Sequence, residues 1–403
     1  MTQPPSSYSE LLREARSLLR EEEICTAREN IVRLARETLA DPMLLYPSDG
    51  YRPRFVVWEL TLRCNMHCRH CGSDAGTRRG HELEPAEALD LCDQLAALGC
   101  ERLTLLGGEP FLREDWEAIT ARLQAGGVRV NVITNGWLTG ERSLVQRIKD
   151  AGLTTFAISV DGVGPRHDEL RCRDGSFARN LQSFDHAVAL GGLSVAAVTT
   201  ITRQVVDQLE ELYAILLDHG VRLWQLQVCT PQGRMRRDDP VLPTPEDLRT
   251  VADFIVAKKQ EGRMRLDPAD NVGYYGPWEL DHGFRSSQRG RVNFWSGCQA
   301  GCQVMGIDAN GDIKGCLSQP SSQREFVEGN VREEPLATIW HRPGGFAYNR
   351  AFTFEMLEGY CRKCEYRGLC RAGCISHAVC TTGSRGDNPT CLHRLIQEGR
   401  LPG

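Results

Sequence analysis

The sequence predicts an α/β protein: a partial (β/α)6 TIM-like barrel, followed by a small cysteine-rich domain. Two observations support this fold. Between residues 55 and 265, six short β-rich runs alternate with segments whose apolar residues recur at helical spacing. From residue 298 onward this periodicity fades and cysteines become frequent. We therefore expect parallel strands joined by crossover helices, and then a region organised by metal rather than by a hydrophobic core.

The first fifty residues are expected to form a helical lead-in to the barrel. Apolar residues recur at helical spacing from Tyr8 to Leu19, and Pro42 and Pro47 end the pattern. The segment has no apolar signal-peptide region, and the chain has no apolar run long enough for a transmembrane helix. We therefore expect a cytoplasmic protein whose residues 1–50 pack on the main domain.

Residues 51–265 are assigned to the barrel. Six strands leave it two β–α units short of a complete eight-fold barrel, which favours an open shape. In such a fold, reacting groups lie on the loops that leave the carboxyl ends of the strands. The predicted strands are FVVWELTL (55–62), RLTLLG (102–107), RVNVIT (129–134), TTFAISV (154–160), SVAAVTT (194–200) and RLWQLQV (222–228).

Residues 266–297 are irregular and aromatic, and we expect them to connect the barrel to the cysteine-rich domain, residues 298–403. This connector could lie over the mouth of the barrel or pack beneath the second domain. The net charge of −5 gives no electrostatic reason to expect nucleic acid or an anionic membrane as a partner.

Seventeen cysteines are numerous for an intracellular chain, in which clustered thiols indicate metal sites rather than disulfides. Cys64, Cys68 and Cys71 lie in CNMHCRHC, directly after the first predicted strand. Three thiolates leave one metal position without a protein ligand. The spacing alone allows zinc with a water molecule in that position, or an iron–sulfur cluster with one open iron.

The CxxxCxxC motif and its position after strand one resemble those of radical S-adenosylmethionine (SAM) enzymes, and the resemblance extends over residues 55–391. It implies that Cys64, Cys68 and Cys71 hold a [4Fe–4S] cluster whose open iron binds SAM. One electron, from an external reductant of the flavodoxin or ferredoxin type, would then cleave SAM to a 5′-deoxyadenosyl radical. His70 stands where the family usually has an aromatic residue, and we expect it to shield the cluster or the adenine.

Motifs after the later strands are implied by the same resemblance to bind SAM. In GGEP, glycines let the backbone approach the methionine amino group, and TNG follows strand three at the ribose. A serine and an arginine after strand four would hold the carboxylate, which suits an arginine fork, although this arginine could instead lie at a solvated helix start. The PQGR turn (231–234) is expected near the adenine. The residues assigned to SAM are Gly107, Gly108, Glu109, Pro110, Asn135, Ser159 and Arg171.

The tail holds eight clustered thiols, enough for two four-ligand sites, and their spacing alone leaves zinc and iron–sulfur open. The pattern resembles the SPASM extension of radical SAM enzymes, which implies two auxiliary [4Fe–4S] clusters with interleaved ligands. Some relatives lack a counterpart of Cys302. With all eight thiolates bound, both clusters would relay electrons rather than bind substrate. One cluster would take Cys298, Cys302, Cys316 and Cys374, and the other Cys361, Cys364, Cys370 and Cys391.

The remaining cysteines are expected to be mostly small buried apolar residues. Cys172 directly follows Arg171, so its thiol could return a hydrogen atom to a substrate radical. The alternative is that it replaces a glycine at a tolerant position. These remaining cysteines are Cys25, Cys92, Cys100, Cys172, Cys229 and Cys380.

Together these features predict a radical SAM enzyme that oxidises, cross-links or epimerises a residue of a peptide or protein. One alternative is a small-molecule substrate such as an aminoglycoside or a sugar. An alternative of another class is a non-enzymatic protein with zinc or iron–sulfur sites. No catalytic base is assigned, because Glu59 and Asp161 lie near strand ends but could be structural.

Overall fold

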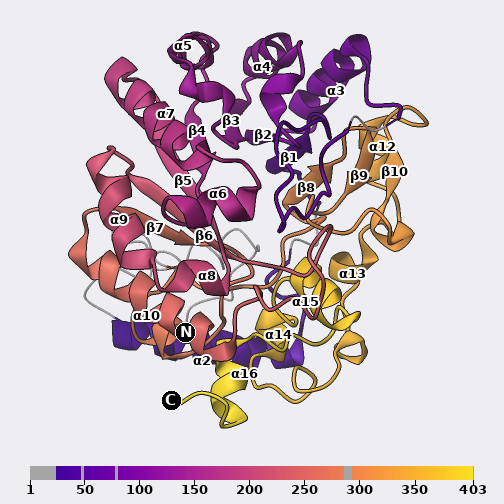
Figure 1. Ribbon diagram of the computed structural model, residues 1–403. Coiled ribbons are helices and arrows are strands. Elements are labelled where there is room, and N and C mark those ends of the chain that lie inside the picture. Colours follow the sequence, from indigo (N-terminus) through magenta and orange to yellow (C-terminus); the bar gives the residue numbers. More distant parts are fainter. Residues whose placement is uncertain (1–23, 47–49, 78–79, 286–292, 403) are drawn as a thin grey trace.

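The structure, a computed structural model, describes residues 24–46, 50–77, 80–285 and 293–402. One ten-stranded sheet forms its centre, in the order β10-β9-β8-β1-β2-β3-β4-β5-β6-β7. Strands β1 to β7 follow one another and are parallel, as in a partial TIM barrel (Figure 1). The strands are β1 Phe55–Glu59, β2 Arg102–Leu106, β3 Arg129–Thr134, β4 Thr155–Ser159, β5 Ser194–Ile201, β6 Leu223–Val228, β7 Arg265–Pro268, β8 Val304–Ile307, β9 Asp312–Lys314 and β10 Gly329–Asn330.

All six predicted strands are present, as β1 to β6. Two further parallel strands were not predicted. β7 extends the sheet beyond β6, and β8 pairs with β1 from the other side. Both have only four residues, so neither carries enough alternation to be recognised in the sequence.

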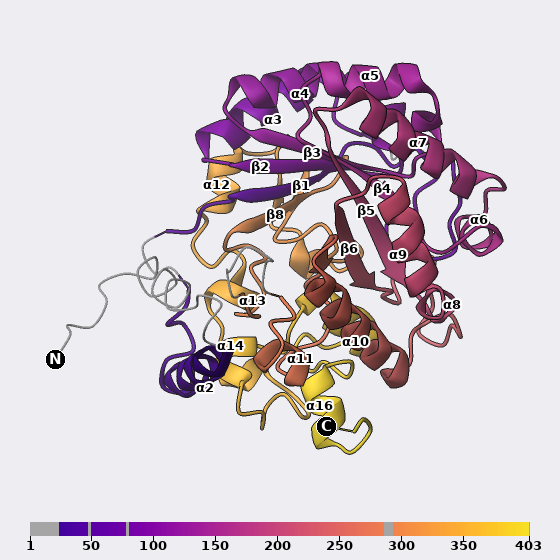
Figure 2. The ribbon, with the colours of Figure 1, turned by 90° about the vertical axis from the view of Figure 1, so that its left-hand side faces the viewer.

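Helices cover the outer side of the parallel strands (Figures 1 and 2). The crossover helix α3 packs on the strands through one apolar face, on which Leu91 and Leu95 are fully buried. A capping box formed by Glu84 and Glu87 stabilises its first turn. The helices of the first half are α2 Ile24–Ala40, α3 Pro85–Ala97, α4 Trp116–Ala125, α5 Arg142–Asp150, α6 Pro165–Arg171, α7 Ser176–Leu190, α8 Arg203–Val206, α9 Leu209–Asp218 and α10 Pro245–Glu261. Those of the second half are α11 Pro277–Leu280, α12 Leu336–Trp340, α13 Ala347–Arg350, α14 Arg367–Cys370, α15 Ile375–Thr382 and α16 Leu392–Gln397.

The cysteine-rich region is joined to the barrel by the sheet itself. Residues Val304 to Ile307 of β8 lie opposite Phe55 to Trp58 of β1. The expectation that this region lacks a hydrophobic core is wrong. Fully buried aromatic and aliphatic side chains of this region belong to the same core as Trp58, because the docked barrel supplies the apolar surface that a small domain alone would lack. They include Phe326, Leu336, Ile339, Trp340 and Phe346.

The N-terminal helix α2 packs on the cysteine-rich region, against α14, rather than on the parallel sheet (Figures 1 and 2). Ile31 and Leu34 are buried in this contact region. Gly368 allows the close approach, since a Cβ there would lie 2.3 Å from the carbonyl oxygen of Thr38. The apolar positions predicted between Tyr8 and Leu19 lie outside the described residues. Within the described part of the chain, no helix has the length and apolarity of a membrane span.

Candidate active site

A cavity of about 300 Å³ opens at the carboxyl ends of the strands. The three thiols of the CNMHCRHC loop line it, although they were separated in the sequence from every other motif. Glu109 and Pro110 do not line it. The predicted site residues that do are Cys64, Cys68, Cys71, Gly107, Gly108, Asn135, Ser159 and Arg171.

Each of these three sulfur atoms lies within sulfur hydrogen-bonding distance of one N–H donor. Such donors stabilise a thiolate, which is the form that binds iron. Burial raises the pKa of Cys64 to about 11, so a buried thiolate here needs positive charge beside it. The donor set therefore fits a thiolate-bound metal cluster. The contacts are Asn135 Nδ2 to Cys64 (3.8 Å), Arg171 Nη1 to Cys68 (4.0 Å) and the Ala75 amide to Cys71 (3.4 Å).

The two glycines of GGEP hold the thiol loop against β2. A Cβ on Gly107 would lie 2.4 Å from the Thr61 carbonyl oxygen, and one on Gly108 would lie 2.3 Å from that of Arg63. The amide of Gly108 donates to Thr61 (2.7 Å), and the next amide, that of Glu109, donates to Arg63 (2.8 Å). The glycines are thus required by backbone-to-backbone packing, in addition to any role in approaching a ligand.

Glu109 is an internal carboxylate that joins the loops after β2 and β3. It is fully buried and accepts hydrogen bonds from the Thr134 hydroxyl (2.8 Å) and the Asn135 amide (2.9 Å). Burial raises its pKa to about 7, although these hydrogen bonds oppose the shift. Its contacts position Asn135 at the cavity.

Asp161 organises the opposite wall and was not recognised as a site residue from the sequence. Its buried carboxylate contacts Arg171 Nε (2.6 Å), His70 Nε2 (2.9 Å) and the amide of Thr200 (2.7 Å). Burial alone would raise the pKa of Asp161, but the charge of Arg171 and the contact with His70 outweigh it and hold that pKa well below its usual range. Its position at the end of β4, in SVDG, was the available signal.

Amide side chains line the part of the cavity formed by β5 and β6, and they too were missed. Gln225 and Gln227 line the cavity, whereas Trp224 and Leu226, which alternate with them along β6, are buried in the core. This alternation was visible in LWQLQV but carried no chemical signature. The other lining residues on this side are Thr200, Gln232, Leu317 and Ser318.

The PQGR turn lies against the thiol loop. Arg234 donates to the carbonyl oxygen of Cys68 (2.7 Å) and forms an ion pair with Asp74 (2.8 Å). Gly233 approaches so closely that a Cβ would lie 2.2 Å from the Cys71 carbonyl oxygen. The turn therefore buttresses the cluster loop from the C-terminal side.

The tail thiols form two groups. Cys361, Cys364, Cys370 and Cys391 line one small cavity together. In the other group, the charges of Cys298 and Cys316 raise the pKa of Cys374, after burial as the main cause. Within the described residues, no three Cys, His, Asp or Glu side chains are close enough to hold a single metal ion.

One predicted cysteine, Cys172, lies apart from these groups, and Cys302 lies near Cys298. Cys172 is exposed at the C-terminal cap of α6 with a φ of 52°, a left-handed conformation that favours glycine, and it does not line the cavity. Cys302 is fully buried, and burial raises the pKa of its thiol; the charges of Arg350 and Arg371 oppose this shift, and that of Cys298 adds to it. The hydrogen-donor role of Cys172 and the ligand role of Cys302 stay predictions.

Two family models match the chain: the radical SAM superfamily over residues 58–216, and an iron–sulfur cluster-binding domain, SPASM, over residues 298–365. An AdoMet-dependent heme synthase of Methanosarcina barkeri is 27% identical over 350 residues, covering 85% of this chain and 97% of that protein. The mycofactocin maturase MftC of Mycolicibacterium smegmatis is 28% identical, covering 84% of this chain and 83% of that protein.

Solved structures share the fold. Streptococcus suis SuiB bound to S-adenosylmethionine superposes with a TM-score of 0.66 at 18% sequence identity, covering 85% of this chain and 77% of that one. The anSMEcpe structure with bound AdoMet and the Cp18Cys peptide gives a TM-score of 0.62 at 14% identity, covering 85% and 94%.

Proposed function

The chain belongs to the radical SAM superfamily and carries a C-terminal SPASM domain, and on this basis we propose that it modifies a residue of a peptide or protein substrate. Its cofactors are SAM and [4Fe–4S] clusters, including auxiliary clusters. When bound, they supply a 5′-deoxyadenosyl radical that removes one hydrogen atom from the substrate. We also propose that an external one-electron reductant supplies the electron for the cleavage of SAM.

We assign the SAM-binding cluster to Cys64, Cys68 and Cys71. The N–H donors beside the three sulfurs support this assignment. Arg171, held in place by Asp161, would present its guanidinium to the carboxylate of SAM from the wall opposite the glycines. The protein's part in the chemistry is to orient SAM and substrate and to exclude water from the cavity.

The size and the lining of the cavity favour a peptide or protein substrate. At about 300 Å³ it is at the lower end of the range for small-molecule pockets, and SAM must share it. The amides of Gln225 and Gln227 can each donate to and accept from a peptide backbone.

A heme precursor is the second candidate, because several curated relatives are heme synthases. Such a macrocycle carries carboxylates that call for free cationic side chains. Two arginines line the cavity, and both are already in use: Arg171 is assigned to the carboxylate of SAM, and Arg234 pairs with Asp74 and donates to the carbonyl oxygen of Cys68. The charge of the lining therefore favours the peptide.

An anaerobic assay of the reduced protein with SAM separates the candidates. The probes are iron-coproporphyrin III and any short peptide encoded beside the gene. We expect a peptide to increase the formation of 5′-deoxyadenosine and to change in mass. Conversion of iron-coproporphyrin III, with no peptide converted, would overturn the peptide proposal. Cys64→Ala is the negative control and should form neither 5′-deoxyadenosine nor methionine. If the wild-type protein also forms neither product, the radical function itself is overturned.

The glutamine wall gives a test of peptide binding. Replacing Gln225 or Gln227 by alanine should raise the KM for the peptide about tenfold each, since each loses a hydrogen bond worth about 1.4 kcal/mol. The matched control is Gln146→Ala on α5, whose half-buried side chain donates to Asp150 and does not line the cavity. An unchanged KM in both wall variants would contradict the proposed binding mode.

A further inference from the structure

Gln319 closes the turn that begins at Cys316, and only 1% of its surface is exposed. The backbone amide of Gln319 donates to the carbonyl oxygen of Cys316 (3.0 Å), and the amide of Cys316 donates to the side-chain oxygen Oε1 of Gln319 (3.0 Å). The buried ammonium of Lys314 donates to the backbone carbonyl oxygen of Gln319 (2.9 Å). Three hydrogen bonds therefore fix Gln319 beside a predicted cluster ligand.

Two donors fix the orientation of the Gln319 carboxamide. Besides the amide of Cys316, the hydroxyl of Tyr348 donates to the same oxygen (3.2 Å). Tyr348 is itself held against the backbone, since a Cβ on Gly315 would lie 2.0 Å from its hydroxyl oxygen. Turning the carboxamide over would bring its NH2 group against the amide of Cys316, and a backbone amide can only donate. The oxygen therefore stays at Cys316, and the NH2 group needs an acceptor elsewhere.

The NH2 group of Gln319 is a buried donor without a protein acceptor. Among the residues that the structure describes, its Nε2 atom has no hydrogen-bond partner. Folded proteins rarely leave a buried donor unpaired, because its loss of hydration is then not compensated. Leu317 and Ser318 line the active-site cavity but Gln319 does not, so a substrate in that cavity is not its acceptor. The acceptor is therefore a group beside the Cys316 turn that the described side chains do not supply.

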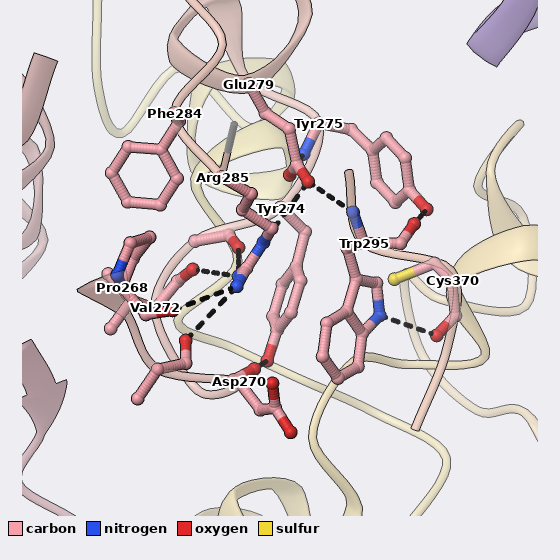
Figure 3. Close-up of polar contacts among 12 residues, drawn as sticks. Pro268, Asp270, Val272, Tyr274, Tyr275, Glu279, Phe284, Arg285, Trp295 and Cys370 are labelled. Carbon is pink, nitrogen blue, oxygen red and sulfur yellow. Dashed lines mark hydrogen bonds and ion pairs between the residues drawn. The ribbon is translucent and has the colours of Figure 1, made fainter. Parts of the chain in front are cut away.

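Donors beside the other group of tail thiols, the one that lines the small cavity, already have protein acceptors (Figure 3). Tyr274 and Tyr275 line that cavity, and their hydroxyls donate to the carbonyl oxygens of Asp270 (2.6 Å) and Trp295, respectively. The indole N–H of Trp295 donates to the carbonyl oxygen of Cys370 (3.1 Å). These three donors are thus engaged with the backbone, whereas the NH2 group in the first group of thiols is free to bind a cluster.

We propose that the NH2 group of Gln319 donates a hydrogen bond to a sulfur atom of the auxiliary cluster that Cys316 binds. The inference rests on the assignment of Cys316 to an auxiliary cluster made above. Hydrogen bonds to cluster sulfurs are among the factors that set the reduction potential.

The expected effect of this hydrogen bond is a higher reduction potential. The reduced cluster carries one more negative charge than the oxidised cluster, so the N–H donor stabilises the reduced form more. Gln319 thereby favours uptake of an electron by this cluster. Such tuning suits an electron relay beside the active site, because Leu317 and Ser318, which follow Cys316, line the active-site cavity.

The test measures the full-length protein by redox titration and pulsed electron paramagnetic resonance. All variants carry alanine at Cys64, Cys68 and Cys71, so that only auxiliary clusters contribute. With glutamine side chains labelled with nitrogen-15, we expect one reduced auxiliary cluster to show a coupling to this nucleus. Gln319→Met should abolish the coupling and lower the reduction potential of that cluster. Gln319→Glu keeps an oxygen for the amide of Cys316, so it should keep the iron content while it loses the coupling.

The matched control is Gln303→Met, which should keep the coupling and the potential, because the Nε2 atom of Gln303 already donates to Gln299 (3.2 Å). Two outcomes would overturn the role of Gln319. In one, the nitrogen-15 coupling is absent from the unchanged Gln319 protein or persists in Gln319→Met. In the other, Gln319→Met keeps the original reduction potential. Cys316→Ala tests the premise separately, since an unchanged spectrum and iron content in that variant would refute Cys316 as a cluster ligand.

Discussion

Asp161 shows how one buried charge can order several groups of a site. Its carboxylate accepts from Arg171, His70 and the amide of Thr200, so both of its oxygens have hydrogen-bond partners. A buried carboxylate is tolerated only with such pairing. His70, which the sequence places where a radical SAM motif usually has an aromatic residue, thus makes a polar contact that a phenyl ring could not make.

His167 supports Asp161 from the other side. Its Nδ1 accepts the backbone N–H of Asp161 (3.0 Å), which requires a neutral imidazole. Desolvation lowers its pKa to about 3, with the charge of Arg171 as a second cause. The unfolded chain binds a proton near pH 6.5, whereas the folded protein does not. This contribution to stability is therefore present above pH 6.5 and lost as the pH falls.

We predict that the wild type loses stability relative to His167→Gln as the pH falls below about 6.5. The expected slope is roughly 1.4 kcal/mol per pH unit until the folded pKa is reached. Thermal midpoints of the two anaerobic proteins, measured between about pH 7.5 and 5, check this. A difference between the midpoints that stays constant with pH would refute it.

At the scale of elements, the loops after β1 and β2 behave as one unit. Their backbones are in direct contact through Gly107 and Gly108, and the PQGR turn closes the other side through Gly233. Three segments far apart in the sequence therefore hold the thiols at fixed positions. The motifs that the sequence assigns one by one to cofactor binding therefore also pack against one another and hold the thiol loop in position.

We predict that Gly108→Ala destabilises this unit by at least about 1–3 kcal/mol, because the new Cβ meets backbone atoms that cannot move aside. The variant should lose iron from the SAM-binding cluster, which iron analysis and the SAM-dependent change in the cluster spectrum would report. The control is Gly76→Ala in the same region, where nothing lies within 4 Å of the added Cβ. Equal iron content in both variants would contradict the prediction.

At the scale of the whole molecule, the barrel and the cysteine-rich region share one sheet and one core. Lys314 on β9 secures the loop that leads from Cys316 to the cavity. Its ammonium is buried, forms an ion pair with Asp308 (2.7 Å) and donates to the carbonyl oxygens of Leu317 (3.1 Å) and Gln319 (2.9 Å). A single buried cation thus links an auxiliary thiol to the active site.

We predict that Lys314→Met costs about 3–5 kcal/mol, because it removes the ammonium that the buried carboxylate of Asp308 faces. The auxiliary spectrum should change while the SAM-binding cluster keeps its spectrum. Lys258→Met is the control: its surface ion pairs with Glu210 and Glu261 are worth about 1 kcal/mol or less. The prediction is checked by the thermal midpoints and the electron paramagnetic resonance spectra of both variants. If Lys314→Met changed only the spectrum of the SAM-binding cluster, Lys314 would not act on the auxiliary cluster as predicted.

The parallel strands and the thiol motifs were accessible from the sequence because both are local patterns. β1 to β6 are runs of β-branched and apolar residues between helical segments, and CNMHCRHC places three thiols within eight residues. β7 and β8 escaped prediction because four residues hold no period, and β8 exists only because β1 lies beside it.

By itself, the sequence determined the class of chemistry, since thiol spacing within a loop does not depend on the rest of the fold. Only the tertiary structure decided which groups meet: Asp161 with His70 and Arg171, and the glutamines with the cavity. These contacts join residues from different strands and loops. No local period records them, because hydrogen bonding and burial depend on distance in space and not on separation along the chain.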